Sequence, residues 1–155
     1  MKKAIVFLLA AAMLMLCGCK EALRDDLDAG DVASAVSEVI PGLTEMRESY
    51  LKGAMKLDTA LFASYSVNIN ASGTSIDEYG VFKAVSQEGV KDVMKAAEDY
   101  LQQRKDNWMP EYMPEERPKL DCARVRSFGL YVVYVIAFDD VRDAAFASAE
   151  AALKK

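Results

Sequence analysis

Two segments near the middle of the chain carry the pattern of β-strands. In residues 65–71, YSVNINA, apolar residues alternate with serine and asparagine, which predicts a strand with one buried face. The run SGTS at 72–75 predicts a turn, and EYGVFKAV at 78–85 predicts a second strand. These two strands are expected to form a hairpin.

After residue 86 the apolar residues recur with the period of a helix. Val90, Val93 and Ala97 are spaced to lie on one face while charged residues occupy the others, and Ser86 is a suitable N-cap. The helix is expected to end in the segment 107–120, NWMPEYMPEERPKL, because three prolines within nine residues prevent its continuation.

The last third of the chain repeats this order of elements. Residues 122–128, CARVRSF, alternate as a strand. The run LYVVYVIAF at 130–138 is apolar on both faces, as in a central strand, and places Tyr131 and Tyr134 on opposite faces. One of the two aspartates at 139–140 is expected to cap a final helix.

A further short helix is expected near the start, because Asp31 can serve as its N-cap and Pro41 ends it. Residues 31–155 are predicted to form a single α+β domain: a four-stranded antiparallel sheet made of two hairpins, with the helices packed on one face. The run VKDVMKAAE from Val90 parallels VRDAAFASA from Val141, each after two strands, which suggests a ββα pseudo-repeat.

The first residues have the layout of a signal peptide. Two lysines follow Met1, an uncharged apolar run extends over 4–16, and LCGC at 16–19 resembles a bacterial lipobox. The apolar run is shorter than the roughly 20 residues that a transmembrane helix needs. We therefore predict that residues 1–18 are a lipoprotein signal peptide and that Cys19 carries a diacylglyceryl group. The alternatives are secretory cleavage at another site and a metal-binding Cys-x-Cys pair.

Lipidation would set the location of the protein. Residues 19–30, CKEALRDDLDAG, are polar and rich in aspartate, and they are predicted to be a lipidated tether between membrane and domain. The membrane, reached through the N-terminal lipid, is thus the first expected partner. The domain is expected on the outer face of the cytoplasmic membrane, where an envelope protein is a second candidate partner.

Charge and composition exclude several classes of function. Loss of residues 1–18 removes two of the 19 basic residues and none of the 24 acidic ones, which leaves 17 against 24 and a net charge of −7. Such a domain is repelled by phosphate backbones, so no nucleic-acid partner is expected. The chain has no histidine, the commonest general base and metal ligand. Because only Cys122 remains beside the lipidated cysteine, we predict no metal site, no cofactor and no catalytic residues.

The proline-containing segment 107–120 offers the best candidates for a binding surface. Prolines stiffen it, and large aromatic side chains provide contact area at low entropic cost. The alternative is that the segment folds back over an open face or edge of the sheet, since a domain of this size needs apolar burial. The candidate binding residues are Trp108, Met109, Tyr112 and Met113.

Three motifs together suggest a known family. They are DEYGVFKA before the long helix, WMPEYMPE after it, and FGLYVVYVIAFDD before the last helix. With the lipobox, they make the chain from about 31 to 153 resemble domain of unknown function 4358, a family of small lipoproteins mostly from clostridia-like Gram-positive bacteria. The resemblance implies surface attachment and an α+β domain, and it supplies no activity and no catalytic residues.

Three functions are compatible with the sequence. The first is a non-enzymatic, membrane-anchored domain that binds a protein or another envelope component. The second is a small-ligand-binding accessory lipoprotein with a site between the sheet and its helices. The third is a hydrolase that uses paired carboxylates, with Glu115-Glu116 and Asp139-Asp140 as the candidates, although adjacent acids are typical of turns and helix caps.

Overall fold

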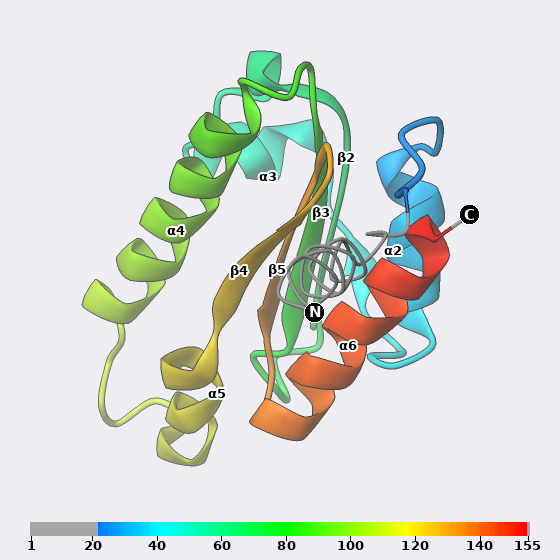
Figure 1. The fold of residues 1–155 in the computed structure, drawn as a ribbon. Coiled ribbons are helices and arrows are strands. Elements are labelled where there is room, and N and C mark those ends of the chain that lie inside the picture. Colours follow the sequence, from blue (N-terminus) through cyan, green and yellow to red (C-terminus); the bar gives the residue numbers. More distant parts are fainter. Residues whose placement is uncertain (1–21, 155) are drawn as a thin grey trace, which may run out of the picture.

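The computed structural model describes residues 22–154, which form an antiparallel sheet flanked by helices (Figure 1). Within them the sheet has five strands in the order β1-β2-β3-β5-β4. The strands are β1 (Thr44–Glu45), β2 (Phe62–Ile69), β3 (Glu78–Ala84), β4 (Arg124–Phe128) and β5 (Tyr131–Ile136). The predicted α+β class is confirmed, whereas the predicted number of four strands is one too few.

The additional strand is β1, which has two exposed residues. It pairs with the end of β2, where Thr44 lies opposite Ile69 and Glu45 opposite Asn68. A strand of two residues leaves no alternation in the sequence, so the hydrophobic pattern could not indicate it. It widens the sheet at the end where the β2–β3 loop lies.

Five α-helices and two short 3₁₀ turns complete the described chain. The helices are α2 (Ala29–Ser37), α3 (Glu48–Gly53), α4 (Val90–Asp106), α5 (Arg117–Cys122) and α6 (Asp139–Leu153), and the turns are η2 (Thr59–Leu61) and η3 (Pro114–Glu116). Two of the helices, α3 and α5, were not expected, and α5 lies in the proline-containing segment 107–120. Pro118 is the second residue of α5, a position where the N–H that proline lacks has no partner within the helix.

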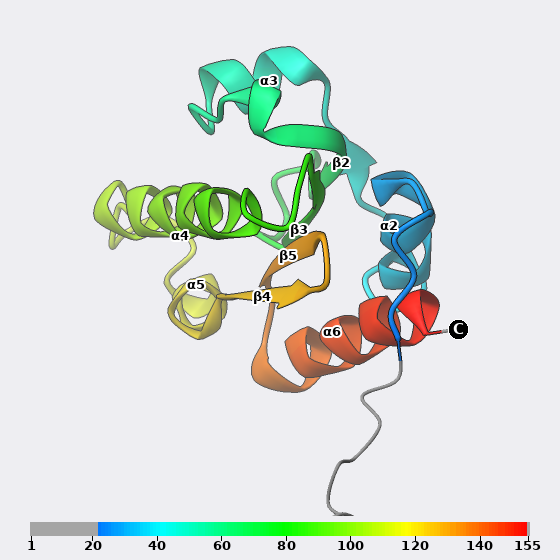
Figure 2. The same cartoon turned by 45° about the horizontal axis from the view of Figure 1, so that its top comes forward.

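The helices cover both faces of the sheet, and the prediction that they pack on one face is wrong (Figure 2). Helices α3, α4 and α5 contribute to the core on one face, called here the α4 face, and α2 and α6 to the core on the other, the α6 face. Every residue of β5 is buried, with Tyr134 in the α4-face core and Tyr131 in the α6-face core. A strand that is apolar on both sides needs a helical layer on each. The opposite orientation of the two tyrosines is confirmed.

The two ββα segments differ in where they place their helices. Helix α4 follows the β2–β3 hairpin and packs on one face, whereas α6 follows the β4–β5 hairpin and packs on the other. The pseudo-repeat therefore stays an unconfirmed prediction.

The described part of the predicted tether contacts the domain. Leu23 forms an isolated antiparallel bridge with Lys154, and the side chains of Leu23 and Leu27 pack against the α6-face core. The backbone carbonyl of Leu27 accepts hydrogen bonds from the Tyr131 hydroxyl at 2.7 Å and from the Lys83 ammonium at 3.0 Å. Apolar residues within the polar segment thus already contact the core, while the predicted boundary after residue 30 stays a prediction.

The first described helix begins earlier than predicted. Its N-cap is Asp28 and not Asp31, because the two aspartates form a capping box in which Asp31 accepts from the Asp28 backbone N–H at 3.0 Å. The predicted signal peptide 1–18 and the predicted lipidation site Cys19 lie outside the described residues. Among residues 22–154 no helix is both long and apolar enough to cross a bilayer.

Two other predicted caps differ in detail. The Ser86 hydroxyl accepts from the backbone N–H of Gly89 at 3.2 Å, and Gly89 is the N-cap of α4. Helix α6 begins at Asp139 after Phe138 and has no side-chain cap, because the Asp139 carboxylate binds Arg142 instead. The N-cap of α4 nevertheless lies three residues after Ser86, and α6 begins at the first of the two predicted aspartates.

Candidate functional site

A cleft of about 340 Å³ opens on the α4 face, at the end of the sheet where β2 turns into β3. Tyr50 of α3 forms one wall, and Asn70 and Asp77 of the β2–β3 loop form another. The C-terminal half of α4 contributes Tyr100 and Arg104. Tyr112, from the segment after α4, also lines the hollow, so four separate parts of the chain meet in it. We call it the β2–β3 cleft.

A buried carboxylate forms the floor of the β2–β3 cleft. Glu78, the first residue of β3, is 2% exposed. Its Oε1 accepts hydrogen bonds from the hydroxyls of Tyr100 and Tyr134, each at 2.7 Å, and its Oε2 pairs with the guanidinium of Arg104. Both oxygens of this acid are therefore occupied by donors, as a charge removed from water requires.

The same cluster holds its members in fixed protonation states. Burial raises the pKa of the Tyr100 and Tyr134 hydroxyls, and the neighbouring Glu78 carboxylate raises it further. Burial alone would lower the pKa of Arg104, but the charge of Glu78 and the hydroxyl of Tyr100 outweigh that effect and raise it. The tyrosines therefore stay neutral and Arg104 stays charged at any physiological pH.

A glycine in β3 makes room for this cluster. Gly80 is the pairing partner of Tyr134 across the β3–β5 ladder, and a Cβ atom at Gly80 would lie 2.2 Å from Cε1 of the tyrosine ring. The ring packs over the glycine, stacks on Phe82 with a centroid distance of 5.9 Å and meets the edge of Tyr100 at 5.7 Å. The absence of a side chain at residue 80 thus lets the Tyr134 hydroxyl reach Glu78.

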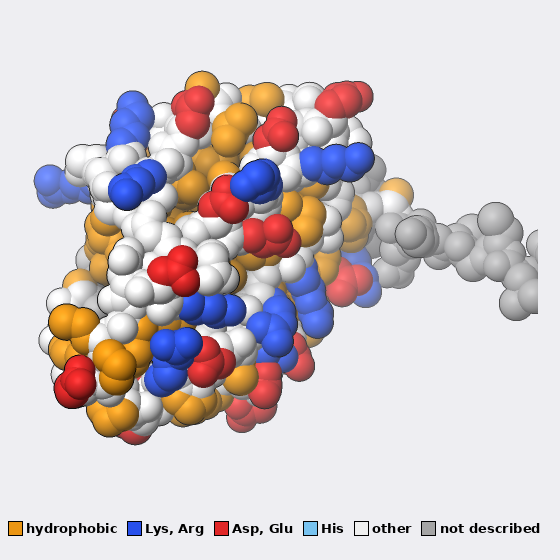
Figure 3. All heavy atoms as spheres, turned by 90° about the vertical axis from the view of Figure 1, so that its left-hand side faces the viewer, with side chains coloured by type: hydrophobic (Ala, Val, Ile, Leu, Met, Phe, Trp, Pro, Cys, Tyr) orange, Lys and Arg blue, Asp and Glu red, His pale blue; other side chains and the backbone are white. Residues whose placement is uncertain are grey.

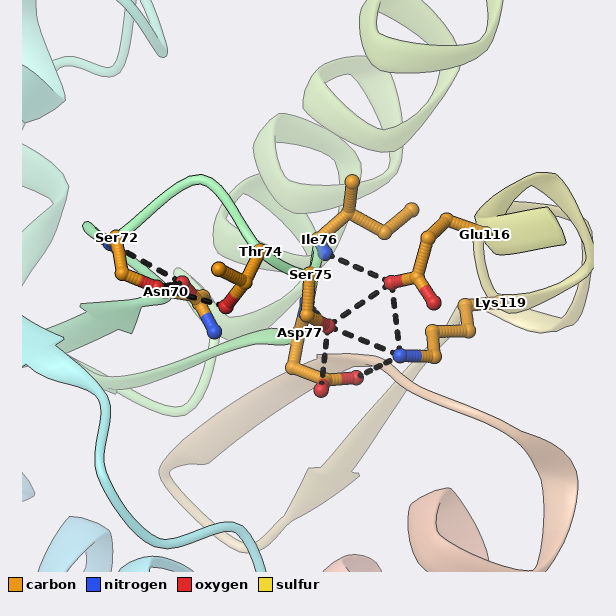
Figure 4. A network of polar contacts seen from close by, with 8 residues as sticks. All are labelled: Asn70, Ser72, Thr74, Ser75, Ile76, Asp77, Glu116 and Lys119. Atoms are coloured by element: carbon orange, nitrogen blue, oxygen red, sulfur yellow. Dashed lines mark hydrogen bonds and ion pairs between the residues drawn. The ribbon is translucent and has the colours of Figure 1, made fainter. Parts of the chain in front are cut away.

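A second polar network connects the β2–β3 loop to η3 and α5 (Figure 4). Oε2 of Glu116 accepts from the Ile76 backbone N–H at 2.9 Å, the Ser75 hydroxyl at 2.9 Å and the Lys119 ammonium at 2.8 Å. Lys119 also contacts Oδ1 of Asp77 at 3.0 Å. The network thus holds the β2–β3 loop, beside the cleft, to a segment about 40 residues later in the chain.

The ionisation of Glu116 follows from these contacts. Burial opposes ionisation, but the hydrogen bonds from Lys119, the Ile76 N–H and Ser75 together lower the pKa of Glu116. Burial would lower the pKa of Lys119, yet Glu116 and Asp77 raise it. Glu116 and Lys119 are thus both charged at neutral pH and stabilise each other.

The loop of residues 70–75 is also ordered from within. Oδ1 of Asn70 accepts from the backbone N–H and the hydroxyl of Ser72, at 3.1 and 2.6 Å, and Ser72 and Thr74 share a hydrogen bond of 2.8 Å (Figure 4). Gly73 has a φ of +71°, a conformation that glycine adopts without strain. The cleft wall formed by Asn70 is therefore built on an internally hydrogen-bonded turn.

The predicted binding residues after α4 differ in how far they are buried, and their role in binding stays a prediction. Trp108 is half-buried and packs against the α4-face core, so it covers part of the sheet layer. Met109 and Tyr112 are 64% and 49% exposed, and Met113 is half-buried. Trp108 and Tyr112 meet edge to face at 6.4 Å. In Figure 3 apolar side chains gather at the lower left, where this loop lies.

The backbone at Met113, just before η3, is in the left-handed region, with a φ of +47°. Tyr112 lines the β2–β3 cleft, so the structure joins one predicted residue to a site that the sequence did not indicate.

The other sequence candidates do not form a reactive site in the described chain. Glu116 of the first acidic pair is engaged by Lys119, and Asp139 of the second pairs with Arg142. Burial and the nearby Asp139 carboxylate raise the pKa of the Cys122 thiol, which keeps it protonated. Within residues 22–154 no cluster of three or more potential ligands could hold a metal ion.

Sequence reasoning missed Glu78 and Arg104, the charged pair of the cleft. A usable signal existed in α4, where Tyr100 and Arg104 are four residues apart and therefore share a face with the apolar stripe of Val93 and Ala97. An arginine at such a position needs a buried acid as its partner. The residue that supplies this acid, Glu78, carries no distinguishing local pattern.

The chain matches a known protein family. The model of the family described as domain of unknown function (DUF4358) matches residues 36–137, which span β1 to β5 and contain the complete β2–β3 cleft. No curated protein and no solved structure matches the chain. Because the family model covers about two thirds of the sequence, the chain belongs to the DUF4358 family.

Proposed function

We propose that the protein is a lipid-anchored, extracytoplasmic binding domain without enzymatic activity, which recognises an envelope component at the end of the sheet that carries the β2–β3 cleft. The observation that carries this proposal is the position of that cleft relative to the start of the domain. The exposed side chain of Tyr112 lines the cleft. The sequence contributes the predicted signal peptide 1–18 and the predicted lipidation of Cys19.

The start of the domain and the cleft lie at opposite ends of the sheet. Leu23 approaches Gly129 in the β4–β5 turn, where its Cβ lies 3.9 Å from the position of a Cβ at that glycine. In the β3–β5 ladder Glu78 pairs with Ile136, so the start of β3 and the β2–β3 loop lie far from that turn. Figure 1 shows the β4–β5 turn at the upper end and the β2–β3 loop at the lower end. The seven residues of β3 separate the two by about 20 Å.

A lipid on Cys19 would orient the domain through this geometry. Four residues lead from Cys19 to Leu23, and such a chain spans at most about 14 Å. The Leu23 end of the sheet would therefore be held close to the membrane, and the β2–β3 cleft would face away from it. A partner would approach from the envelope side.

Binding is favoured over hydrolysis by the state of the buried acid. Both oxygens of Glu78 accept hydrogen bonds from side chains of the protein, and neither is left to activate a water molecule. Oε2 of Glu116 accepts three hydrogen bonds, from Lys119, Ser75 and the Ile76 N–H, so this carboxylate serves the network beside the cleft. The chemistry that the cleft offers is recognition by hydrogen bonds and aromatic contact.

The proposal is tested by photo-crosslinking on intact cells that produce the full chain. A benzophenone amino acid replaces Tyr112 at the cleft and, in the control, Val85, which is 59% exposed near the end where the domain starts. We expect a discrete adduct with an envelope component from position 112 and none from position 85. Equal adducts from the two positions, or none from position 112, would refute the proposal.

Anchoring is tested separately with Cys19→Ala. We expect this variant to leave the membrane fraction or to accumulate as the uncleaved precursor, while mass spectrometry of the wild type finds an acylated N-terminus at residue 19. An unmodified mature N-terminus in the wild type would refute lipid anchoring and leave the crosslinking result to stand alone.

A further inference from the structure

We propose that the β2–β3 cleft binds a neutral sugar ring, so that the recognised envelope component is a glycan. This inference rests on the proposed binding function and names the chemistry of the ligand. It follows from the charge balance of the cleft, the polar groups left open in its wall, and the aromatic side chain at its edge.

The charges around the cleft are paired with one another. Arg104 in the wall is neutralised by Glu78, and Asp77 contacts Lys119, which also binds Glu116. These groups leave a small negative excess and no uncompensated positive charge to attract an anion. A ligand with a carboxylate or phosphate would have to enter against that excess, so a neutral ligand is favoured.

The wall offers both donors and acceptors that the described residues leave unbound. Arg104 uses only Nη1 in its hydrogen bonds to Glu78 and Tyr100, which leaves Nε and Nη2 without a described partner. Asn70 accepts through Oδ1, and its amide nitrogen has no described partner. Gln103 donates through Nε2 to the Ala54 carbonyl at 3.2 Å, and its Oε1 is likewise without one. A sugar hydroxyl both donates and accepts, so it fits a mixed set of this kind.

The edge of the cleft carries an aromatic ring. Tyr112 is 49% exposed, lines the cleft and is held edge to face by Trp108. The C–H groups of a sugar ring present an apolar face that packs on an aromatic plane, while its hydroxyls point outward to polar partners. The cleft volume of about 340 Å³ is at the lower end of the range of about 300–1,000 Å³ for small-ligand sites, as expected for one or two sugar rings.

The single tryptophan of the chain provides the assay. Trp108 contacts Tyr112 at the cleft edge, so its fluorescence in the full chain, purified in detergent, reports an occupied cleft. The neutral probe is the β-1,4-linked tetramer of N-acetylglucosamine, and the charged probe is the tetramer of galacturonic acid. We expect a saturable change with the neutral probe, with a Kd on the order of 1 mM or below, and binding of the acidic probe at least about tenfold weaker.

Two neighbouring glutamines on α4 form a matched pair of variants. Gln103 lines the cleft, whereas Gln102 is exposed, bonds Asp106 and does not line it. We expect Gln103→Ala to weaken binding of the neutral probe about tenfold and Gln102→Ala to leave it unchanged. Tyr112→Phe keeps the ring and should retain binding, while Tyr112→Ala should abolish it.

The outcomes separate this inference from the proposed function. No saturable change with the neutral probe up to about 10 mM, in protein whose circular dichroism is that of a folded domain, overturns the sugar assignment. Equal affinity for the acidic probe, or equal loss from Gln102→Ala and Gln103→Ala, overturns it as well. If crosslinking from position 112 still captures a component that carries no sugar, the binding function stands and only the ligand class fails.

Discussion

The substitution Gly80→Ala tests whether the close approach of Tyr134 to β3 organises the cleft. The added Cβ would lie 2.2 Å from Cε1 of the ring and 3.0 Å from Cδ1 and Cζ, closer than non-bonded atoms allow. The ring has little room to move aside, because Tyr134 is fully buried between Phe82 and Tyr100. Any shift of the ring also moves the Tyr134 hydroxyl away from Oε1 of Glu78, to which it donates at 2.7 Å.

The expected loss of stability combines three effects. Overpacking in a closed core costs about 1–3 kcal/mol. A weakened hydrogen bond to a buried charge costs about 1.5–3 kcal/mol. Alanine restricts the unfolded chain more than glycine does, which offsets this loss of stability by roughly 0.5–1 kcal/mol. We therefore expect Gly80→Ala to lower the free energy of unfolding by about 2–5 kcal/mol.

Equilibrium urea denaturation followed by far-UV circular dichroism measures this loss. Gly53→Ala is the matched control, because nothing lies within 4 Å of its added Cβ and its φ is not left-handed. It should leave stability unchanged or raise it slightly. In the double variant with Tyr134→Leu, Gly80→Ala should cost much less than it does alone, since the clashing ring is gone.

Two results would contradict this reasoning. A loss below about 0.5 kcal/mol for Gly80→Ala would mean that the strands adjust to the extra atom without strain. Additive losses in the double variant with Tyr134→Leu would mean that the substitution acts elsewhere than on the ring.

Two further predictions concern the network beside the β2–β3 loop. Lys119→Met should lower the free energy of unfolding, measured by urea denaturation, by about 3 kcal/mol, because it leaves Glu116 buried without its cation. The control Lys91→Met, at an exposed position, should have little effect. The lowered pKa of Glu116 predicts that the stability difference between wild type and Glu116→Gln is fully present above about pH 4.5 and is lost as the pH falls through the lower pKa of the folded state. Denaturation at several pH values checks this sign, and a difference that widens on acidification would contradict it.

The hydrophobic period predicted those elements that are long enough to show it. Strands β2, β3 and β5 and helices α4 and α6 were all expected from the sequence, with boundaries displaced by a few residues. Strand β1 and helices α3 and α5 were missed, because β1 has two residues, α3 has only six, and α5 contains a proline near its start. The run 130–138 did indicate that helices cover both faces of the sheet, because a strand with apolar residues on both sides needs a helical layer on each.

The candidate site was less accessible to sequence reasoning than the fold. Tyr112 was singled out because an exposed aromatic residue beside prolines is unusual, and that signal is local. Glu78 and Arg104 are 26 positions apart in the sequence. They meet because the strand pairing places Glu78 at the cleft end of the sheet and because α4 is oriented with Arg104 facing the sheet. Neither a charged strand residue nor a charged helix residue reveals its burial until the two elements are placed together.

The alternation of the central strands directs different side chains to the two faces of the sheet. Glu78 on β3 and Tyr134 on β5 meet on the α4 face, where they form the floor of the cleft. Tyr131 on β5 points to the α6 face and holds the carbonyl of Leu27, where the chain enters the domain. Tyr134 and Tyr131 of one strand thus contribute to the cleft on one face and hold the Leu27 carbonyl on the other. A shift of one residue in the β3–β5 register would exchange the two sets of side chains, so the pairing of Gly80 with Tyr134 secures both sets of contacts at once.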